Sequence, residues 1–338
     1  MSEHITTGKG FAEIALENRK TKRTFLDDIS KIIDWRPVEE LLKRHYKRVQ
    51  SADGRPAYPP LSMFKILLLQ RWYTLSDEGI EEAMYDRISF VRFSGLSISS
   101  VVPDSTTICR FRNEIIKGEL YKKVLKELNR QLEHKGIIVK QGAIVDATII
   151  DSSRRPRKVV NVMDEDRSEG EEPKVDISYS SDVEAKWLRK GNKPYYGYKL
   201  SMSTDMDGFI IGGHMTPANE SDTKQLKRVV EELDLPGRAL ILADKGYSSK
   251  ANRDMIKENG YTDMIMHKAS RGKELSYWEK LFNRAVSSIR FKVERSFGTL
   301  KRQYRFNRAR YLGVVKTEME FYLNAMAFNI KRAALLVT

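Results

Sequence analysis

Three carboxylates, Asp146, Asp244 and Glu294, lie in settings that could support metal-dependent chemistry. Asp146 interrupts a β-branched, apolar run at residues 142–150, where an unpaired buried carboxylate would cost several kcal/mol. Asp244 follows the apolar run 239–243, and open sheets often place their chemistry at the carboxyl end of such a strand. Either aspartate could instead be structural, bonded to backbone amides in the core or capping the helix that follows.

Glu294 is the lone acid in a segment with nine basic residues, between residues 283 and 310. A basic strip of this kind is typical of a surface that follows a phosphate backbone, and a carboxylate within it would repel phosphate. A carboxylate at this position would have a function if it held a divalent cation that acts on the phosphate. An ordinary surface ion pair with a neighbouring arginine is the alternative. The nine bases are Arg284, Arg290, Lys292, Arg295, Lys301, Arg302, Arg305, Arg308 and Arg310.

Three carboxylates with cations alongside suit two Mg²⁺ ions roughly 3.5–4 Å apart, with Mn²⁺ as an expected substitute. Such ions would activate a water or a 3′-OH and would stabilise the leaving oxygen during an in-line displacement at phosphorus. The helix that must carry Glu294 is predicted at about residues 276–304, where Arg290, Glu294 and Lys301 share one face. Its apolar stripe is expected to include Trp278, Leu281, Phe282, Ala285, Ile289, Val293, Phe297 and Leu300.

Net charge and cysteine content limit the class of protein. The chain has 338 residues, enough for two domains, and its 60 Lys and Arg exceed its 46 Asp and Glu by 14. This excess, with a pI near 9.6, indicates a polyanionic partner. Cys109 is the single cysteine, so no internal disulfide is expected, and five scattered histidines argue against a zinc site. No apolar run is long enough to span a bilayer, and we expect a cytoplasmic, nucleoid-associated protein.

Residues 1–136 are predicted to form an all-α domain for DNA binding and dimerisation. Helix N-caps are indicated at Ser76, where acids occupy the first turn, and near Ser105. The two helices could form a helix-turn-helix motif in which Arg110 and Arg112 contact DNA. The alternative is a compact helical bundle for dimerisation whose basic residues are merely solvated.

Residues 137–338 are predicted to form an α/β catalytic domain, with a mixed sheet flanked by helices. The strand-like periodicity begins at residue 142. A polar insertion at about residues 154–193 interrupts the sheet, and its acidic centre is expected to be a solvated loop. Between residues 187 and 196, basic and aromatic side chains are interleaved, which suits either a nucleic-acid surface or ordinary strand packing.

Three motifs together resemble the DDE transposases of bacterial insertion sequences. The first two are Val145-Asp146-Ala147-Thr148 and Ala243-Asp244-Lys245-Gly246-Tyr247. The third places Glu294 four residues after Arg290 and seven before Lys301, as the signature of that family does. The family pattern expects a tyrosine three positions before the arginine, where this chain has Ser287.

Tyr196-Gly197-Tyr198-Lys199, and Asn219 with Asp222, also resemble the branch often called IS-five-like. The resemblance covers most of the chain and implies an RNase H-like catalytic domain whose metal ligands are the three carboxylates. It implies Mg²⁺-dependent cleavage at terminal inverted repeats and joining of the 3′-OH ends to target DNA, by a homodimer or a larger homo-oligomer. The residues expected to contact double-stranded DNA are Arg290, Lys301, Arg295, Arg302, Arg305, Arg308, Lys199, Arg110 and Arg112.

Two other functions remain compatible with the sequence. A metal-dependent nuclease of the same fold would cleave DNA without joining its ends. A non-catalytic DNA-binding protein descended from a transposase would need none of the three carboxylates. The presence of all three favours the transposase.

Overall fold

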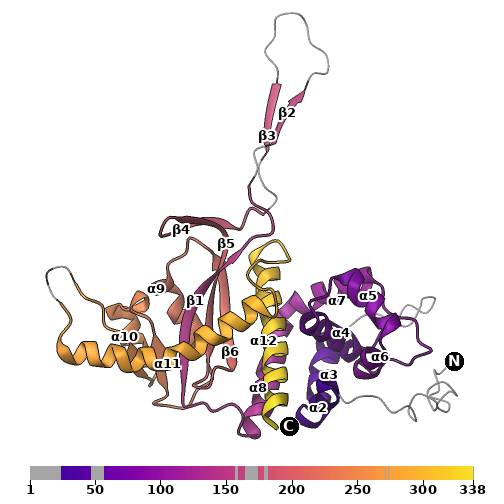
Figure 1. Cartoon of the computed structure of the whole chain (residues 1–338), viewed down its shortest axis with the longest axis horizontal. Coiled ribbons are helices and arrows are strands. Elements are labelled where there is room, and N and C mark those ends of the chain that lie inside the picture. The colour runs from indigo at the N-terminus through magenta and orange to yellow at the C-terminus, as the bar shows by residue number, and fades with distance from the viewer. Residues whose placement is uncertain are drawn as a thin grey trace, which may run out of the picture. The chain divides into compact units, whose positions relative to one another are not determined.

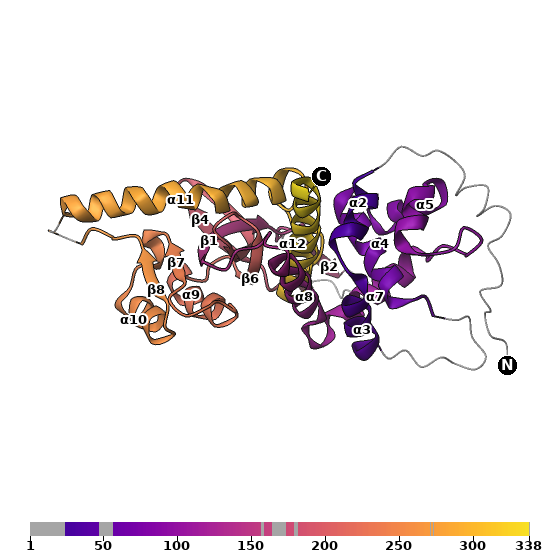
Figure 2. The same ribbon diagram turned by 90° about the horizontal axis from the view of Figure 1, so that it is seen from below.

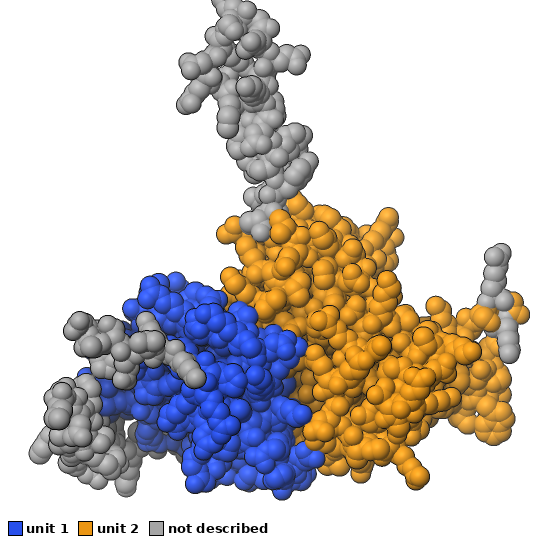
Figure 3. Space-filling view, turned by 180° about the vertical axis from the view of Figure 1, so that it is seen from behind, with its two compact units in different colours: residues 1–137, 326–338 blue, residues 138–325 orange. Residues whose placement is uncertain are grey.

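The chain divides into two compact units in the computed structural model (Figure 3). Unit 1 comprises residues 1–137 with 326–338, and unit 2 comprises residues 138–325. The sequence-based boundary at residue 136 lies beside this division, but residues 326–338 group with the helical unit. No helix among the described residues is long and apolar enough to cross a membrane. The described residues are 24–46, 57–156, 159–163, 174–178, 182–270, 272 and 274–337.

Unit 1 is a helical bundle around α4 (Pro60–Trp72), which has a proline in its first turn. Ten of the 13 residues of α4 are buried, so this helix passes through the middle of the bundle. The Trp72 indole N–H donates to the backbone oxygen of Ala327 at 2.8 Å, which ties α4 to the second half of α12 (Val314–Val337). The other helices of this unit are α2 (Phe25–Ile32), α3 (Trp35–His45), α5 (Asp77–Asp86), α6 (Ile88–Ser94), α7 (Ser105–Ile116), η1 (Lys117–Glu119) and α8 (Leu120–His134).

A buried ion pair joins α5 to α7. Two guanidinium nitrogens of Arg112 donate to the Asp77 carboxylate at 2.6 and 2.7 Å, and Gln70 donates to the same carboxylate at 2.6 Å. Only 5% of the Arg112 side chain is exposed. This geometry corrects the expectation that Arg112 contacts DNA, because its guanidinium faces the interior of the bundle. Arg110 is exposed, and α6, which the sequence did not predict, separates α5 from α7 along the chain.

Unit 2 is built on a six-stranded mixed sheet that contains β1 (Gly142–Asp151) (Figure 1). β1 pairs antiparallel with β5 (Lys193–Thr204) and parallel with β7 (Leu240–Ala243). β7 in turn pairs parallel with β8 (Thr262–Ile265), and β6 (Ile210–Pro217) pairs antiparallel with β5. The strand order β4-β5-β1-β7-β8, in which β4 is Lys186–Lys190 and β6 also pairs with β5, confirms the predicted RNase H-like mixed sheet.

Helices cover both faces of this sheet (Figure 2). α9 (Asp222–Glu231) and α10 (Lys250–Glu258) pack on one face, in a core that includes Val145 of β1. α11 (Tyr277–Arg302) packs against β1 and β7 on the other face. Because neighbouring residues of a strand point to opposite faces, Asp146 points away from the α9 core and toward α11.

Part of the insertion at residues 154–193 forms strands that the sequence analysis did not predict, and two of them form a two-stranded sheet of their own. β2 (Val159–Met163) pairs antiparallel with β3 (Lys174–Ser178), and β4 (Lys186–Lys190) joins the main sheet beside β5. Asp182, which is 1% exposed, accepts a hydrogen bond from the Tyr198 hydroxyl at 2.5 Å and so anchors the chain just before β4. The acidic centre of the insertion lies outside the described residues.

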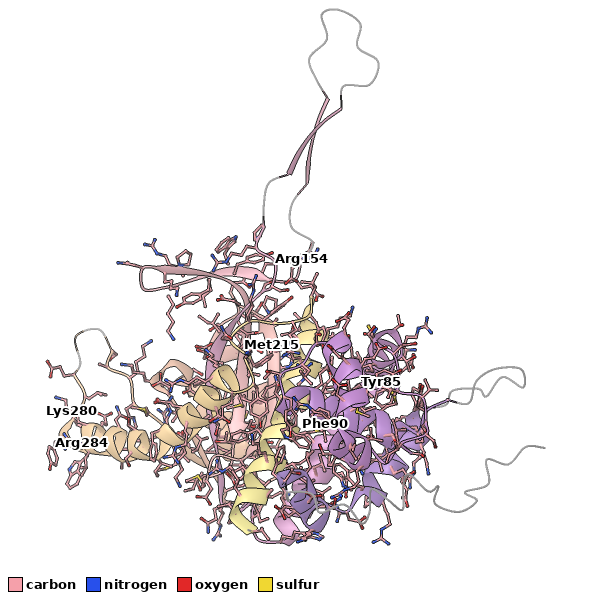
Figure 4. All side chains as sticks on the ribbon, turned by 45° about the vertical axis from the view of Figure 1, so that its right-hand side comes forward. Tyr85, Phe90, Arg154, Met215, Lys280 and Arg284 are labelled. Atoms are coloured by element: carbon pink, nitrogen blue, oxygen red, sulfur yellow. The ribbon has the colours of Figure 1, made fainter. Side chains whose placement is uncertain are left out.

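α11 extends beyond the sheet at its N-terminal end, so its buried face is shorter than the sequence predicted (Figure 4). Trp278 and Leu281 are 74% and 43% exposed, and Lys280 and Arg284 lie on the same projecting part. The expected apolar stripe was therefore wrong for Trp278, Leu281 and Ala285, which are all exposed. The buried residues of the helix are Val286, Arg290, Val293, Ser296, Phe297 and Leu300.

The Asp77–Arg112 pair should stabilise the protein in a pH-dependent way. Burial alone would raise the pKa of Asp77, but hydrogen bonds from Arg112 and Gln70 outweigh it and lower that pKa. The resulting stability is present above the unfolded pKa of about 3.9 and is lost as the pH falls through the lower, folded value. We expect Asp77→Asn to reduce the free energy of unfolding by about 3 kcal/mol at neutral pH.

Chemical denaturation of the whole chain at neutral pH and below about pH 4 measures this effect, and the deficit of Asp77→Asn should shrink in acid. Glu78→Gln is the matched control, because Glu78 is exposed in the same helical turn. A deficit of equal size at both pH values would show that the ion pair does not carry the stability.

Candidate functional site

Asp146 and Asp244 are brought side by side by the pairing of β1 with β7. The two strands run parallel with Val145 opposite Ala243, so the next residue of each strand lies at the same level. Val145 and Ala243 both belong to the α9 core, so the aspartates that follow them point to the face covered by α11. The register of two strands therefore places two carboxylates together.

The guanidinium of Arg290 lies between these aspartates. Its Nη2 donates to Asp146 Oδ2 at 2.8 Å, and its Nη1 lies 3.5 Å from Asp244 Oδ1. Only 10% of the Arg290 side chain is exposed, against 19% for Asp146 and 40% for Asp244. The sequence analysis expected Arg290 to contact DNA, and the structure places its guanidinium inside the site, against the two aspartates.

Hydrogen bonds on either side of Arg290 fix the rotation of α11. Before it, the Asn283 side chain accepts from the backbone N–H of His267 at 2.7 Å and donates to the backbone oxygen of His267 at 2.9 Å. After it, the Ser296 hydroxyl donates to the backbone oxygen of Gly208 at 2.7 Å. The helix is thus held to unit 2 at two levels, which directs Arg290 at the sheet.

Burial raises the pKa of Asp146, and the charge of Asp244 raises it further, while Arg290 and the Ala147 N–H oppose these effects. Burial also raises the pKa of Tyr247 well above its ordinary value, and the charge of Asp146 adds to that effect. The Tyr247 side chain is 2% exposed and packs in the α9 core with Val145 and Ala243.

Both aspartates also make the structural contacts that the sequence left open. Asp146 Oδ1 accepts from the Ala147 N–H at 2.8 Å. Asp244 Oδ1 accepts from the Lys245 N–H at 2.7 Å, as the N-cap of η2 (Lys245–Tyr247). These bonds orient the two carboxylates, but a structural role alone does not require both of them to converge on one guanidinium.

Glu294 lies about one helical turn after Arg290 on α11 and is exposed. Its side chain forms no hydrogen bond or ion pair within the part of the chain that the structure describes. Across the described ranges, no group of three or more His, Cys, Asp or Glu side chains is close enough to hold a metal ion. The structure therefore brings Asp146 and Asp244 together and leaves Glu294 apart from them.

Lys301 is half-buried about two turns beyond Glu294. Burial lowers the pKa of Lys301, and the charge of Lys190 lowers it further, whereas Asp151 opposes them. Lys190 ends β4, so the hairpin of β4 and β5, with its interleaved basic and aromatic residues, lies near the end of α11.

The other arginines of the basic strip differ in their availability. Arg295, Arg302 and Arg305 are exposed. Arg308 donates to the backbone oxygen of Ser153 at 2.6 Å, which ties the segment after α11 to the end of β1. Three of the four arginines beyond Glu294 that were expected to contact DNA thus present their guanidinium groups to solvent.

Lys199 lies on the opposite face of the sheet from Asp146. It pairs with Asp222 of α9 at 2.8 Å, donates to the backbone oxygen of Glu220, and has a side chain that is 10% exposed. This placement corrects the expectation that Lys199 contacts DNA, since its ammonium is committed to α9.

Sequence reasoning missed two features of this site. It did not foresee that Arg290 contacts Asp146, a contact between residues 144 positions apart in the chain. It also gave Tyr247 no role, although an aromatic residue three positions after Asp244, beside an apolar strand, was a usable signal for a buried core residue.

An RNase H-like sheet with aspartates on two neighbouring parallel strands defines a class of domain with a paired-carboxylate site. Comparison with known proteins then gives the family. The family model described as "Transposase DDE domain" matches residues 138–330, and the model described as "Transposase domain (DUF772)" matches residues 14–114. The chain belongs to the DDE transposase family, which confirms the resemblance found in its sequence.

One relative is described as the transposase for insertion sequence element IS1106 from Neisseria meningitidis serogroup B. It is 37% identical over 228 residues, which cover 67% of this chain and 77% of that protein. Among solved structures, the piggyBac transposase synaptic complex with hairpin DNA matches with a TM-score of 0.39 and 12% identity, over 92% of this chain and 73% of that one. The Mos1 strand transfer complex matches with a TM-score of 0.22 and 9% identity, over 88% and 91%.

The charge of Lys301 should lower the free energy of unfolding of the protein. The same charge should help to bind DNA on the surface that follows Glu294. Because its folded-state pKa is lowered, the charged lysine reduces stability at every pH below that value, and the penalty disappears above the ordinary lysine pKa of about 10.4. We expect Lys301→Met to raise the melting temperature at neutral pH by about 2 °C and to weaken DNA binding. Melting curves and DNA titrations measure both effects.

Arg302→Met is the matched control for this substitution, because Arg302 is exposed on the next position of the same helix. It should weaken DNA binding without changing the melting temperature. A fall in the melting temperature of Lys301→Met would mean that Lys301 stabilises the fold.

Proposed function

We propose that this protein is an insertion-sequence transposase that binds the ends of its element, cleaves them with the help of Mg²⁺, and joins the 3′-OH ends to target DNA. The observation that carries the proposal is the convergence of Asp146 and Asp244 on one cationic group. Two carboxylates held side by side on a rigid sheet offer the oxygen ligands that Mg²⁺ prefers. Membership of the DDE transposase family, whose members are generally divalent-metal dependent, supports the same chemistry.

Asp146 and Asp244 would hold the divalent cation, and Glu294 would join them by turning from its exposed position toward the sheet. The chemistry that a bound cation supplies is activation of a water or a 3′-OH and stabilisation of the leaving oxygen. Tyr247 would support the site from the α9 core, where it packs with Val145 and Ala243, the residues that precede the two aspartates. The hydrogen bonds of the Ala147 and Lys245 amides keep the two aspartates oriented before substrate arrives.

Positive groups on α11 and on the hairpin of β4 and β5 would bind the DNA backbone. Arg295, Arg302 and Arg305 are exposed along and just beyond the second half of α11. The hairpin adds four cations near the end of the same helix and contains no acid between residues 186 and 199. Together these groups form a surface that suits phosphates on either side of the cleaved bond. The hairpin cations are Lys186, Arg189, Lys190 and Lys193.

Replacing any of the three carboxylates by its amide should remove cleavage while preserving DNA binding. We expect Asp146→Asn, Asp244→Asn and Glu294→Gln each to lower Mg²⁺-dependent cleavage of end DNA by at least about 100-fold, because amides are poor ligands for a hard cation. Gel assays of cleavage and of binding on the same DNA measure both effects. Glu258→Gln, an exposed acid on α10, is the control.

Full cleavage by one of these variants would remove that residue from the site. A pre-cut DNA end with a free 3′-OH separates the transposase from a nuclease of the same fold. The transposase joins this end to target DNA, whereas a nuclease leaves it unjoined.

The dependence of DNA affinity on salt should report the phosphate contacts of the arginines. We expect log affinity to fall steeply with log salt concentration, and Arg302→Gln with Arg305→Gln to make the slope shallower by up to about 0.9 per lost contact. Arg130→Gln is the control, because Arg130 is already paired with Glu127 at 2.8 Å. An unchanged slope in the double variant would show that these arginines do not contact phosphate.

A further inference from the structure

Arg290 occupies the position between the two aspartates where a bound cation would be needed. Its guanidinium contacts Asp146 Oδ2 at 2.8 Å and Asp244 Oδ1 at 3.5 Å. Nη1 also lies 3.6 Å from the sulfur of Met266, a weak acceptor. Nε is buried and has no hydrogen-bond partner among the described residues. The guanidinium is therefore held mainly by the charges of the two aspartates.

Two carboxylates at neighbouring strand positions repel each other unless a positive group lies between them. One guanidinium supplies a single positive charge against two negative charges, so the pair is only partly neutralised. A divalent cation would neutralise both carboxylates and would use the same oxygens at shorter distances. These oxygens cannot serve Arg290 and a metal ion in full at the same time.

We infer that Arg290 is the resident counter-cation of this site and competes with the divalent cation for Asp146 and Asp244. This inference rests on the proposed function and adds a step to it, in which binding of the metal releases the guanidinium. The released group would lie on α11 beside the exposed arginines and would be free to bind a phosphate bidentately. DNA that held Arg290 would then favour metal binding, and metal would favour DNA binding to the same extent.

The test is a titration of the DNA-free protein with Mn²⁺. Calorimetry and the electron paramagnetic resonance signal of unbound Mn²⁺ both measure the binding. Arg290→Gln should bind Mn²⁺ at least about fivefold more tightly than the wild type, because the competing cation is absent. Without metal, the same variant should have a lower melting temperature than the wild type. Added Mn²⁺ should raise the melting temperature of the variant by more than it raises that of the wild type.

Arg295→Gln is the matched control, since it removes the same charge from the same helix while Arg295 lies over the ring of Phe291 instead of between the aspartates. Its affinity for Mn²⁺ should stay within about twofold of the wild type, as expected for an exposed and screened charge. Equal tightening in both variants would show a general effect of net charge and would overturn the inference.

Binding of Mn²⁺ by Arg290→Gln that equals or falls below the wild type would also overturn it. If Arg290→Gln does not fold, the affinity of Arg290→Lys for Mn²⁺ is measured instead. An ammonium cannot bridge two carboxylates as the planar guanidinium does, so this variant should compete less well with Mn²⁺ and bind it more tightly than the wild type. A failure of the proposed function looks different. In that case the wild type binds no Mn²⁺ at a site that Asp146→Asn removes.

Discussion

The parallel pairing of β1 with β7 is the constraint on which the rest of the site depends. It sets Val145 opposite Ala243, and the next step along both strands is an aspartate. Bringing two carboxylates together on a partly covered sheet face is unfavourable unless something positive joins them. The position of α11 answers this need, because the helix is fixed by hydrogen bonds on both sides of Arg290 and delivers its guanidinium to the pair. The register of two strands therefore creates the paired charges, and the position of α11 supplies the opposite charge.

The two aspartates could be predicted from sequence because each one breaks a local pattern. An acid within a β-branched run, and an acid at the end of an apolar strand, are both visible without knowing what lies nearby. The mixed sheet was predictable for the same reason, since its strands have a clear period. Strands β2, β3 and β4 were missed because they lie in an insertion that is polar as a whole. The short β4 is also mostly exposed, so no apolar alternation marks it.

The partners of the basic residues could not be predicted. Arg112 and Lys199 each belong to a basic stretch, yet both are buried against an acid from another element, Asp77 and Asp222 respectively. Net charge gives the number of cations and not which of them are neutralised by the fold. The rotation of α11 was equally hidden, because a helix that projects beyond its sheet can expose Trp278 while burying Arg290. Long-range packing determines which side chains are buried in such a helix, and the local sequence does not show it.

One helix carries Arg290, Glu294 and Lys301, so their mutual spacing is set by the helical repeat and by nothing else. An insertion of one residue between Arg290 and Glu294 would turn everything after it by about 100° around the axis. The hydrogen bond of Ser296 to Gly208 would then be lost, and Lys301 would move away from Lys190. Between His267, which Asn283 of α11 holds, and the start of α11, the number of residues is subject to no such rule. Over evolutionary time, changes in length should therefore accumulate before Tyr277 and be absent from Arg290 to Lys301.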